Sequence, residues 1–463
     1  MKYGTSGFRD EAKKIINISF KIGEIMAYLT TSKNENFGIM ITASHNKYID
    51  NGVKIIDRKG NMIEKDYEII LEKYINNEFE FLKKNYDYFS PKKIFIGHDT
   101  RNSYFEIQNE IVKGIRSATD NVRIVNLGYV TTPQHHFLVK YNNENPDFYI
   151  NKYNCINLFN MHFDDLIIDC ANGVGFIALS KLNEFWDLKM NLVNTKVYNY
   201  NLLNHESGSD YVINDQLLPY NEKFSNMLGC SVDGDADRFI FYYFDDFIKI
   251  LDGDYIALLY LLAVDKYIDK EFTIGYIHTP YTNNAIIDYI KKINSKINIT
   301  CTATGVKNLH HEALKYDISV YFESNGHGTI LINNNKLLEN SFFKHVSMLN
   351  NEVVGDGISG IFCVKYFLKC LNMNHIEWYN KVQKNNFILY KKEVEDKDIY
   401  KTNKIGDRLC QPIEVQNELD ILMKKYNCFC FIRPSGTENV IRIYIESNSN
   451  IEDIKDQIDN LIN

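Results

Sequence analysis

Short apolar runs alternate along this chain with longer segments that mix apolar and polar residues. Each run is ended by small or polar residues, a pattern typical of β-strands buried on both faces. The runs are Phe37–Thr42, Ile94–Ile96, Leu166–Ile168, Phe272–Ile277 and Ile318–Phe322. Between them, Tyr255–Tyr267 and Asn284–Ile293 have the length and spacing of helices. This alternation predicts an α/β protein whose sheets lie between layers of helices.

The C-terminal part of the chain follows a different order, two strands and then a helix. Cys428–Ile432 and Val440–Ile445 are apolar runs on either side of a Pro-Ser-Gly turn. In the segment after them, Ile451, Ile454 and Ile458 fall on one helical stripe. The order predicts a smaller α+β domain at this end.

Polar stretches at residues 141–160 and 380–405 are predicted to be linkers. A chain of 463 residues is long enough for several domains. We expect boundaries near residues 150, 250 and 378. The expected domains are 1–150, 151–250, 251–378 and 379–463.

Composition narrows the classes of function. Acidic residues outnumber basic ones by 60 to 52, for a formal net charge of −8. This argues against a nucleic-acid partner, which requires a basic face, but it allows a local basic pocket for a phosphorylated small molecule. Nine cysteines without metal spacing and a start without an apolar leader predict a cytoplasmic protein. The longest apolar stretch, Tyr255–Val264, is too short to cross a bilayer, so no membrane partner is expected.

Three aspartates at alternate positions predict a cation site. Asp233, Asp235 and Asp237 are separated only by glycine and alanine. A tight loop of carboxylates suits Mg²⁺, which takes hard oxygen ligands. An EF-hand calcium loop is excluded because the places of its glycine and glutamate hold Arg238 and Phe244.

A serine loop follows one of the predicted strands. Thr42-Ala43-Ser44-His45-Asn46 comes at the end of the run that starts at Phe37, and open α/β sheets bind ligands at the carboxyl ends of their strands. His45 is a candidate proton carrier, and Lys54 is a candidate for the same pocket. The loop lacks the Gly-x-Ser-x-Gly pattern of hydrolases, and taken alone it also fits an ordinary polar loop.

Two further loops have the composition of ligand sites. Glu323-Ser324-Asn325-Gly326-His327-Gly328 supplies polar groups for sugar hydroxyls, and its two glycines would leave room beside the sugar; a plain polar turn has the same composition. Arg433-Pro434-Ser435-Gly436-Thr437 combines a turn whose N–H groups can bind an anion with a guanidinium that can bind phosphate. Arg442 follows one strand later. The alternative is a hairpin turn with a solvated arginine.

In this order the four motifs resemble those of the α-D-phosphohexomutase superfamily, with a phosphoserine loop, a metal loop, a sugar loop and a phosphate loop. The resemblance extends from Tyr3 to Arg442. Within the superfamily the chain is similar to the phosphoacetylglucosamine mutases. Its serine loop precedes Gly97-His98-Asp99-Thr100-Arg101, and the segments Thr304–His311 and Phe322–Thr329 resemble theirs. The resemblance implies four domains around a central cleft, three α/β domains of sandwich type and a smaller C-terminal α+β domain, which carry the four loops in chain order.

The resemblance also implies a role for each matching residue. Ser44 would carry the phosphoryl group, and its phosphate would hold one Mg²⁺ together with Asp233, Asp235 and Asp237. Arg9, His45 and Lys54 would act at the transferring group, with His45 or Lys54 as general acid or base. The implied substrate ligands are Arg238, Glu323, Ser324, Asn325, Arg433, Pro434, Ser435, Gly436, Thr437 and Arg442.

The implied activity is a mutase that interconverts N-acetyl-D-glucosamine 6-phosphate and 1-phosphate in UDP-N-acetylglucosamine biosynthesis. It would act through the phosphoserine and a sugar bisphosphate, which also serves as activator. The alternatives are a phosphoglucomutase or phosphomannomutase, a metal-dependent phosphatase, and a non-catalytic sugar-phosphate-binding protein. The sequence departs from the family pattern at Lys47, where the serine loop usually ends in proline, so we expect a more mobile loop.

Overall fold

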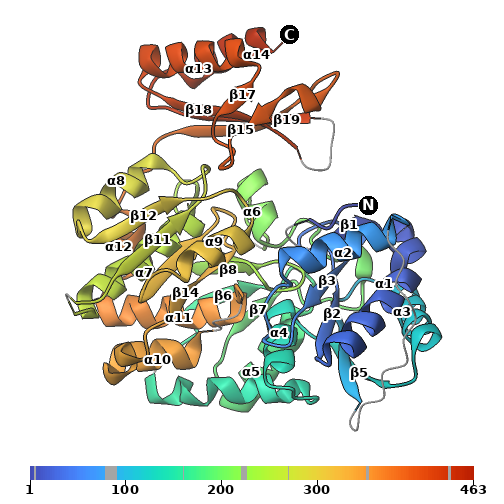
Figure 1. Ribbon diagram of the computed structural model, residues 1–463. Coiled ribbons are helices and arrows are strands. Elements are labelled where there is room, and N and C mark those ends of the chain that lie inside the picture. Colours follow the sequence, from blue (N-terminus) through green and yellow to red (C-terminus); the bar gives the residue numbers. More distant parts are fainter. Residues whose placement is uncertain are drawn as a thin grey trace.

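The computed structural model describes residues 1–4, 7–78, 91–159, 161–220, 227–269, 271–350, 354–435 and 440–462. These residues form four main β-sheets, one after another along the chain, with helices packed against them (Figure 1). A short two-stranded sheet accompanies the last of them. The α/β fold with a smaller α+β unit at the C-terminus is confirmed, whereas the boundaries near residues 150, 250 and 378 stay predictions.

The first sheet has the strand order β1-β3-β2-β4-β5. β2 lies at its centre, parallel to β4 and antiparallel to β3. The helices Ala12–Lys33 and Tyr104–Ala118 cross at two glycines, where their backbones approach closely. A Cβ at Gly23 would lie 2.0 Å from the Ile111 carbonyl oxygen, and one at Gly114 would lie 1.9 Å from the Phe20 carbonyl oxygen. The elements are β1 Phe8–Glu11, α1 Ala12–Lys33, β2 Phe37–Ile41, β3 Asp50–Ile56, α2 Lys65–Ile75, β4 Lys92–His98, α3 Tyr104–Ala118, β5 Val122–Tyr129 and α4 Thr132–Lys140.

The second sheet has the order β10-β9-β8-β6-β7 and the third β12-β11-β13-β14. The second comprises β6 Leu166–Asp169, α5 Gly175–Trp186, β7 Asn191–Val193, the 3₁₀ turn Tyr200–Leu202, α6 Ser209–Asp215, β8 Leu228–Val232, β9 Phe239–Phe244 and β10 Ile248–Leu251. The third comprises α7 Gly253–Tyr267, β11 Ile274–His278, α8 Asn284–Ile293, β12 Ile297–Cys301, α9 Val306–Ala313, β13 Ile318–Phe322, β14 Gly328–Ile332, the 3₁₀ turn Asn335–Glu339, α10 Ser341–Leu349, α11 Gly357–Leu371 and α12 His375–Tyr379.

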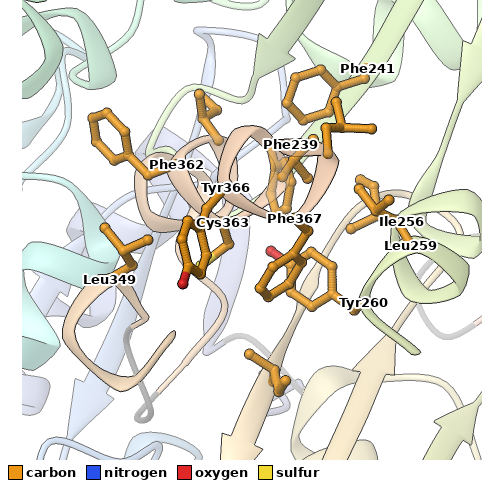
Figure 2. Close-up of a cluster of buried hydrophobic side chains, with 14 of the residues drawn as sticks. Phe239, Phe241, Ile256, Leu259, Tyr260, Leu349, Phe362, Cys363, Tyr366 and Phe367 are labelled. Atoms are coloured by element: carbon orange, nitrogen blue, oxygen red, sulfur yellow. The ribbon is translucent and has the colours of Figure 1, made fainter. Parts of the chain in front are cut away.

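These two sheets share one hydrophobic core. Its buried apolar residues form a continuous cluster from Tyr149 to Val382. Figure 2 shows part of the cluster, where the ring of Phe367 of α11 lies beside that of Tyr260 of α7, with their centroids 4.7 Å apart. The N-terminus of α11 is capped by the Asp356 carboxylate, which accepts from two backbone N–H groups at 3.1 Å.

The predicted linker at 141–160 does join the first sheet to the second, but it is not a plain polar connection. This stretch contains a 3₁₀ segment, Pro146–Phe159, in which the rings of Tyr149 and Tyr153 are fully buried. Their hydroxyls lie 2.7 Å apart, and that of Tyr149 donates to Asp356 at 2.7 Å. Tyrosine can bury its ring while its hydroxyl stays bonded, so a polar composition did not reveal this part of the core.

The C-terminal unit has the antiparallel order β15-β19-β18, with α13 and α14 on one face of the sheet (Figure 1). Its strand β15 lies inside the predicted linker 380–405, which is therefore wrong over that part. The elements are β15 Phe387–Glu393, the 3₁₀ turn Lys397–Ile399, β16 Lys401–Thr402, β17 Leu409–Gln411, α13 Ile413–Tyr426, β18 Phe429–Pro434, β19 Val440–Glu446 and α14 Ile451–Leu461. Within the described ranges, no helix is both long and apolar enough to cross a membrane.

Candidate active site

Ser44 lies in the turn after β2 and has a left-handed backbone conformation, with φ of 54°. Its side chain is buried. The hydroxyl donates to Asp233 Oδ2 at 2.6 Å and lies 3.5 Å from Asp237 Oδ1. The structure therefore brings the predicted serine loop of the first sheet against the predicted metal loop of the second.

The three aspartates of the metal loop form the turn between β8 and β9. Their side chains are buried, and one oxygen of each lies within 4.8 Å of the others. Asp233 Oδ1 accepts the backbone N–H groups of Asp237 and Arg238 at 3.1 and 3.2 Å, which closes the turn around this carboxylate. Burial raises the pKa of Asp233 well above its ordinary value, and the neighbouring Asp237 and Asp235 raise it further.

This carboxylate cluster fits a divalent cation. Asp235 Oδ1 is buried and has no hydrogen-bond partner among the groups that the structure describes. A buried carboxylate oxygen without a partner is costly, and a second and third carboxylate nearby add repulsion. A hard cation such as Mg²⁺ would satisfy the oxygen and relieve the repulsion.

Lys54 of β3 bridges two of the aspartates. Its ammonium donates to Asp235 Oδ2 and to Asp237 Oδ2, each at 2.7 Å. Burial alone would lower the pKa of Lys54, but the two carboxylates outweigh burial and raise it. Burial would likewise raise the pKa of Asp237, but Lys54, His327 and Arg238 hold it well below the usual range. Lys54 is therefore a fixed cation within the cluster.

His45 faces the serine hydroxyl on one side and Asp210 on the other. Its Nδ1 lies 3.5 Å from Ser44 Oγ, and its Nε2 lies 3.8 Å from Asp210 Oδ2. Burial lowers the pKa of His45 well below 6.5, and the nearby Arg238 and Arg9 lower it further. The imidazole is therefore neutral at pH 7, the form that can accept a proton.

The remaining predicted residues of this region lie in the same place. Arg9 Nη1 donates to Asn46 Oδ1 at 3.2 Å, beside the serine loop. Arg238 Nη1 donates to Asp210 Oδ1 at 3.4 Å, and its Nε lies 3.9 Å from Asp233 Oδ2. The structure thus brings together eight of the predicted residues, namely Arg9, Ser44, His45, Lys54, Asp233, Asp235, Asp237 and Arg238.

Two residues of this region were missed by the sequence analysis. Asp210 contacts both His45 and Arg238, and Thr132 donates from its hydroxyl to Asp235 Oδ2 at 2.6 Å. Asp210 stands in a polar stretch without a motif. The only sequence signal near Thr132 is the helix-capping pair Thr131 and Gln134 at the start of α4.

The predicted sugar loop is the turn between β13 and β14, and much of its polar surface shapes the loop itself. Glu323 Oε1 accepts the N–H of Gly305 at 2.8 Å, and Asn325 Oδ1 accepts that of His327 at 3.0 Å. Ser324 Oγ donates to Asp254 Oδ1 at 3.0 Å. The carbonyl of Gly326 accepts the N–H of Phe239 at 3.3 Å, which places the loop beside the metal loop.

The two glycines of this loop do not leave room for a substituent of the sugar, and that expectation is wrong. A Cβ at Gly326, where φ is 84°, would lie 2.0 Å from the Phe239 carbonyl oxygen. A Cβ at Gly328 would lie 2.1 Å from the Tyr321 carbonyl oxygen. Both glycines are required because backbone passes close to backbone.

The predicted phosphate site lies on the sheet face of the C-terminal unit that is opposite its helices. Arg433 and Arg442 stand directly opposite each other on β18 and β19. Like charges at such a position repel, and none of the described carboxylates pairs with either guanidinium. Arg433 Nη1 instead donates to Thr304 Oγ1 at 2.8 Å. An anion held between the two arginines would relieve the repulsion.

Two other predicted residues of this site, Pro434 and Ser435, lie at the end of β18, where the N–H of Ser435 donates to the carbonyl of Val440 at 2.9 Å. Gly436 and Thr437 lie outside the described residues. The contact with Thr304 connects the phosphate loop to Gly305, and through it to Glu323 of the sugar loop. No described contact joins Arg433 or Arg442 to the serine loop.

Comparison with known proteins agrees with this arrangement. Family profiles match in chain order: "Phosphoglucomutase/phosphomannomutase, alpha/beta/alpha domain I" at residues 4–82 and 79–151, "Phosphoacetylglucosamine mutase AMG1, domain II" at 138–240, "domain III" of the same family at 252–373, and "Phosphoglucomutase/phosphomannomutase, C-terminal domain" at 394–461.

A phosphoacetylglucosamine mutase of Candida albicans is 34% identical, over 99% of this chain and 96% of its own length. The N-acetylphosphoglucosamine mutase of Aspergillus fumigatus, solved with GlcNAc-6P and magnesium, superposes with a TM-score of 0.91 at 30% identity, covering 100% of this chain and 95% of that one. A variant of the Aspergillus enzyme solved with glucose 1,6-bisphosphate has a TM-score of 0.89 at 29% identity, covering 100% and 94%.

Proposed function

The chain belongs to the phosphoacetylglucosamine mutase family, and on that premise we propose that Ser44 is its phosphoryl carrier. The enzyme interconverts N-acetylglucosamine 6-phosphate and 1-phosphate through a bisphosphate intermediate. The observation that carries the assignment of Ser44 is the contact of its hydroxyl with Asp233, 2.6 Å away in the carboxylate cluster. A serine in this place can receive a phosphoryl group directly beside a cation site.

The proposed reaction has two transfers. In the first, the O–P bond of phosphoserine 44 breaks as a sugar hydroxyl forms its own O–P bond, and the hydroxyl proton leaves. In the second, the bisphosphate has turned over and returns its other phosphoryl group to the Ser44 oxygen, which leaves the isomeric monophosphate. Mg²⁺ held by Asp233, Asp235, Asp237 and the phosphate on Ser44 would supply positive charge for the loose phosphoryl transition state.

His45 and Lys54 have different parts in this proposal. His45, a neutral ring 3.5 Å from Ser44 Oγ, accepts the proton of the attacking sugar hydroxyl and gives it to the departing Ser44 oxygen in the first transfer. In the second transfer it accepts the proton of the Ser44 hydroxyl and gives it to the departing sugar oxygen. Lys54, bonded to two aspartates, remains a cation that balances negative charge near the transferring group. Arg9 and Arg238 add positive charge on the same side.

The remaining loops hold the sugar phosphate. Arg433 and Arg442, with Pro434, Ser435, Gly436 and Thr437, bind the phosphate that is not transferred, because a forked guanidinium matches its oxygens. Glu323 and Asn325 bind sugar hydroxyls. Ser324 acts as a hydrogen-bond acceptor for the sugar, because its own O–H group already donates to Asp254. We place the enzyme in the cytoplasm, in UDP-N-acetylglucosamine biosynthesis, with small molecules and neither nucleic acid nor membrane as partners.

Replacement of the serine tests the proposal. Ser44→Ala removes the only proposed relay, so isomerisation falls by several orders of magnitude while the fold persists. Ser117→Ala, on α3 at the edge of the first sheet, is the control and keeps normal activity. Intact mass after incubation with glucose 1,6-bisphosphate shows one added phosphate on the wild type and none on Ser44→Ala. Near-normal isomerisation by Ser44→Ala would refute the assignment.

A substrate panel separates the family activity from its alternatives. We expect kcat/KM for N-acetylglucosamine 1-phosphate to exceed that for glucose 1-phosphate or mannose 1-phosphate by about 10- to 200-fold, since one missing contact in a pocket costs about 1–3 kcal/mol. A preference for glucose or mannose would favour a phosphoglucomutase or phosphomannomutase. Release of inorganic phosphate without isomerisation would favour the phosphatase, and binding without turnover would favour the non-catalytic protein.

A further inference from the structure

Two side chains donate hydrogen bonds to the same two backbone carbonyl groups of the serine loop. Neither has a part in the proposed mechanism. One is Arg101, from the Asp-Thr-Arg segment after β4, and the other is Asn204, from the segment between β7 and α6. We propose that Arg101 and Asn204 are positioning residues, which clamp the serine loop against the metal loop and hold Ser44 in place for transfer. The proposal rests on the proposed role of Ser44.

Arg101 forms the first half of the clamp. Its Nη2 donates to the carbonyl oxygens of Ser44 and Asn46 at 3.1 and 2.6 Å. The side chain is fully buried and paired with the buried Asp99, whose carboxylate also accepts the Arg101 N–H at 3.0 Å. Breaking a buried pair of this kind is strongly unfavourable, so the guanidinium has a fixed position.

From Asp99 the hydrogen-bond network extends to the backbone of Ser44. Asp99 Oδ2 accepts the hydroxyl of Thr42 at 2.6 Å, and Thr42 Oγ1 accepts the N–H of Ser44 at 2.9 Å. The C=O of Ser44 is therefore held by Arg101 and its N–H by Thr42, whose hydroxyl is in turn held by Asp99. This network supports the left-handed conformation of Ser44, which is unfavourable for a residue with a side chain.

Asn204 forms the second half, from the other sheet. Its Nδ2 donates to the carbonyl oxygens of Ser44 and Asn46 at 2.8 and 3.0 Å. Its own N–H donates to the Ala171 carbonyl at 3.0 Å, at the end of β6. The residue also has a left-handed φ of 54°. The amide thus connects the serine loop to the sheet that carries the aspartates.

The metal loop packs directly against this contact. A Cβ at Gly234 would lie 2.8 Å from the Ser44 carbonyl oxygen and 2.9 Å from Asn204 Nδ2. Glycine between the first two aspartates is therefore required by the clamp. The clamp also grips Asn46, the residue before Lys47, so that these hydrogen bonds restrain the loop where the usual proline ring is absent.

Replacement of Asn204 tests the proposal, because this residue is not buried as deeply as Arg101. Asn204→Gly suits the left-handed backbone and removes only the amide. Asn172→Gly is the matched control: Asn172 has φ of 52° and its amide donates to Leu202, with no described contact to the serine loop. The measurements are kcat, KM, the single-turnover rate of phosphoryl transfer from Ser44, and the unfolding temperature.

We expect Asn204→Gly to lower kcat and the single-turnover rate by about 10- to 100-fold, because a shift of about 1 Å in a reacting group has an effect of this size. KM for the sugar phosphate should change less than about threefold by the same reasoning, since its ligands lie elsewhere. Asn172→Gly keeps kcat within about twofold of the wild type, as expected for a site outside the reaction. A purely structural role would lower the unfolding temperature of both variants alike and leave kcat of both near normal.

Asn204→Asp supplies a second variant with the same shape. Its carboxylate cannot donate and repels the two carbonyl oxygens, so transfer from Ser44 is slowed at least as much as in Asn204→Gly. If both Asn204 variants match Asn172→Gly in kcat, the clamp is refuted. Phosphorylation of wild-type Ser44 by glucose 1,6-bisphosphate, read by intact mass, tests the role of Ser44 separately; if it fails, the proposed function fails first.

Discussion

At the scale of single residues, the site is organised by charge compensation in a buried place. Three carboxylates occupy one turn, and Lys54 neutralises two of them through hydrogen bonds of 2.7 Å. The third, Asp233, accepts the Ser44 hydroxyl and two backbone N–H groups. Asp235 alone retains a buried oxygen without a described partner, which makes it the most informative aspartate to replace.

Asp235→Asn should weaken Mg²⁺ binding and turnover while the protein stays folded. The asparagine Oδ1 can still accept from Lys54 and Thr132, so the packing persists, but one charge is lost from the cluster. Replacing even an indirect metal contact costs about 10- to 100-fold in affinity, so we expect at least this loss in a Mg²⁺ titration of activity. Asp245→Asn, exposed in the β9–β10 hairpin, is the control. An unchanged Mg²⁺ dependence would remove Asp235 from the metal site.

At the scale of elements, α4 shows how neighbouring histidines can serve packing instead of metal binding. His135 Nε2 lies 3.2 Å from the Phe95 carbonyl oxygen and His136 Nδ1 lies 2.7 Å from that of Gly60. Both rings are buried, and burial lowers the pKa of His135 to about 3 and that of His136 to about 4. The helix is therefore docked on the first sheet by two uncharged imidazoles.

This docking makes stability depend on pH. The pKa of His136 is lowered from 6.5 to about 4 in the folded protein. As the pH falls, this histidine is therefore protonated in the unfolded chain before it is protonated in the folded protein. The stabilisation that the neutral His136 side chain contributes is complete above pH 6.5 and is lost as the pH falls towards 4. The side-chain amide of His136→Asn can bond Gly60 but does not titrate. Between these pH values the slope of the free energy of unfolding against pH should therefore be smaller in this variant, by the equivalent of about one proton taken up on unfolding.

Urea unfolding at a series of pH values measures this slope. The exposed His205 supplies the control for the loss of a histidine, because His205→Asn removes no buried ring and should leave the slope of the wild type unchanged. Equal slopes for wild type and His136→Asn would show that His136 does not contribute to the acid sensitivity of the fold.

At the scale of the whole molecule, the C-terminal unit is joined to the part of the chain that carries the third sheet by partly buried polar contacts. The Glu446 carboxylate accepts the N–H of Asn284 at 3.0 Å and the amide of Asn385 at 2.7 Å. Lys384 donates to Asp252 and Asp254 at 2.6 and 2.8 Å. These contacts set where the arginines of the last sheet lie relative to the sugar loop.

Arg433→Lys should therefore impair both binding and turnover. Lysine keeps the charge but loses the fork that bonds Thr304 and can bind a phosphate with two N–H groups. One hydrogen bond to a charged group contributes about 1.5–3 kcal/mol, so kcat/KM should fall about tenfold or more. Arg408→Lys, at an exposed pair with Asp420 in the same unit, is the control. An unchanged kcat/KM would place Arg433 outside the site.

The local order of the chain was sufficient to predict the buried strands and the four loops. β2, β6, β13 and the helix α14 coincide with their predicted runs to within a few residues, because their apolar pattern reflects burial that neighbours in sequence share. The strand β15 was missed because it is an edge strand whose apolar residues are interrupted by the exposed Lys391 and the half-buried Lys392. The 3₁₀ segment after α4 was missed because tyrosine counts as partly polar yet buries its ring.

The same distinction applies to the site. Ser44 and the three aspartates could be predicted because each stands in a short motif that follows a strand. That Ser44 meets Asp233 depends on a hydrogen bond between residues 189 apart, and no local pattern contains it. Asp210 and Asn204 stand in no motif, and the helix cap beside Thr132 does not reveal its contact with Asp235, since these residues act only through partners that folding brings to them. The glycines of the sugar loop look like open space in the sequence, and only the packed backbone shows that Phe239 and Tyr321 already fill it.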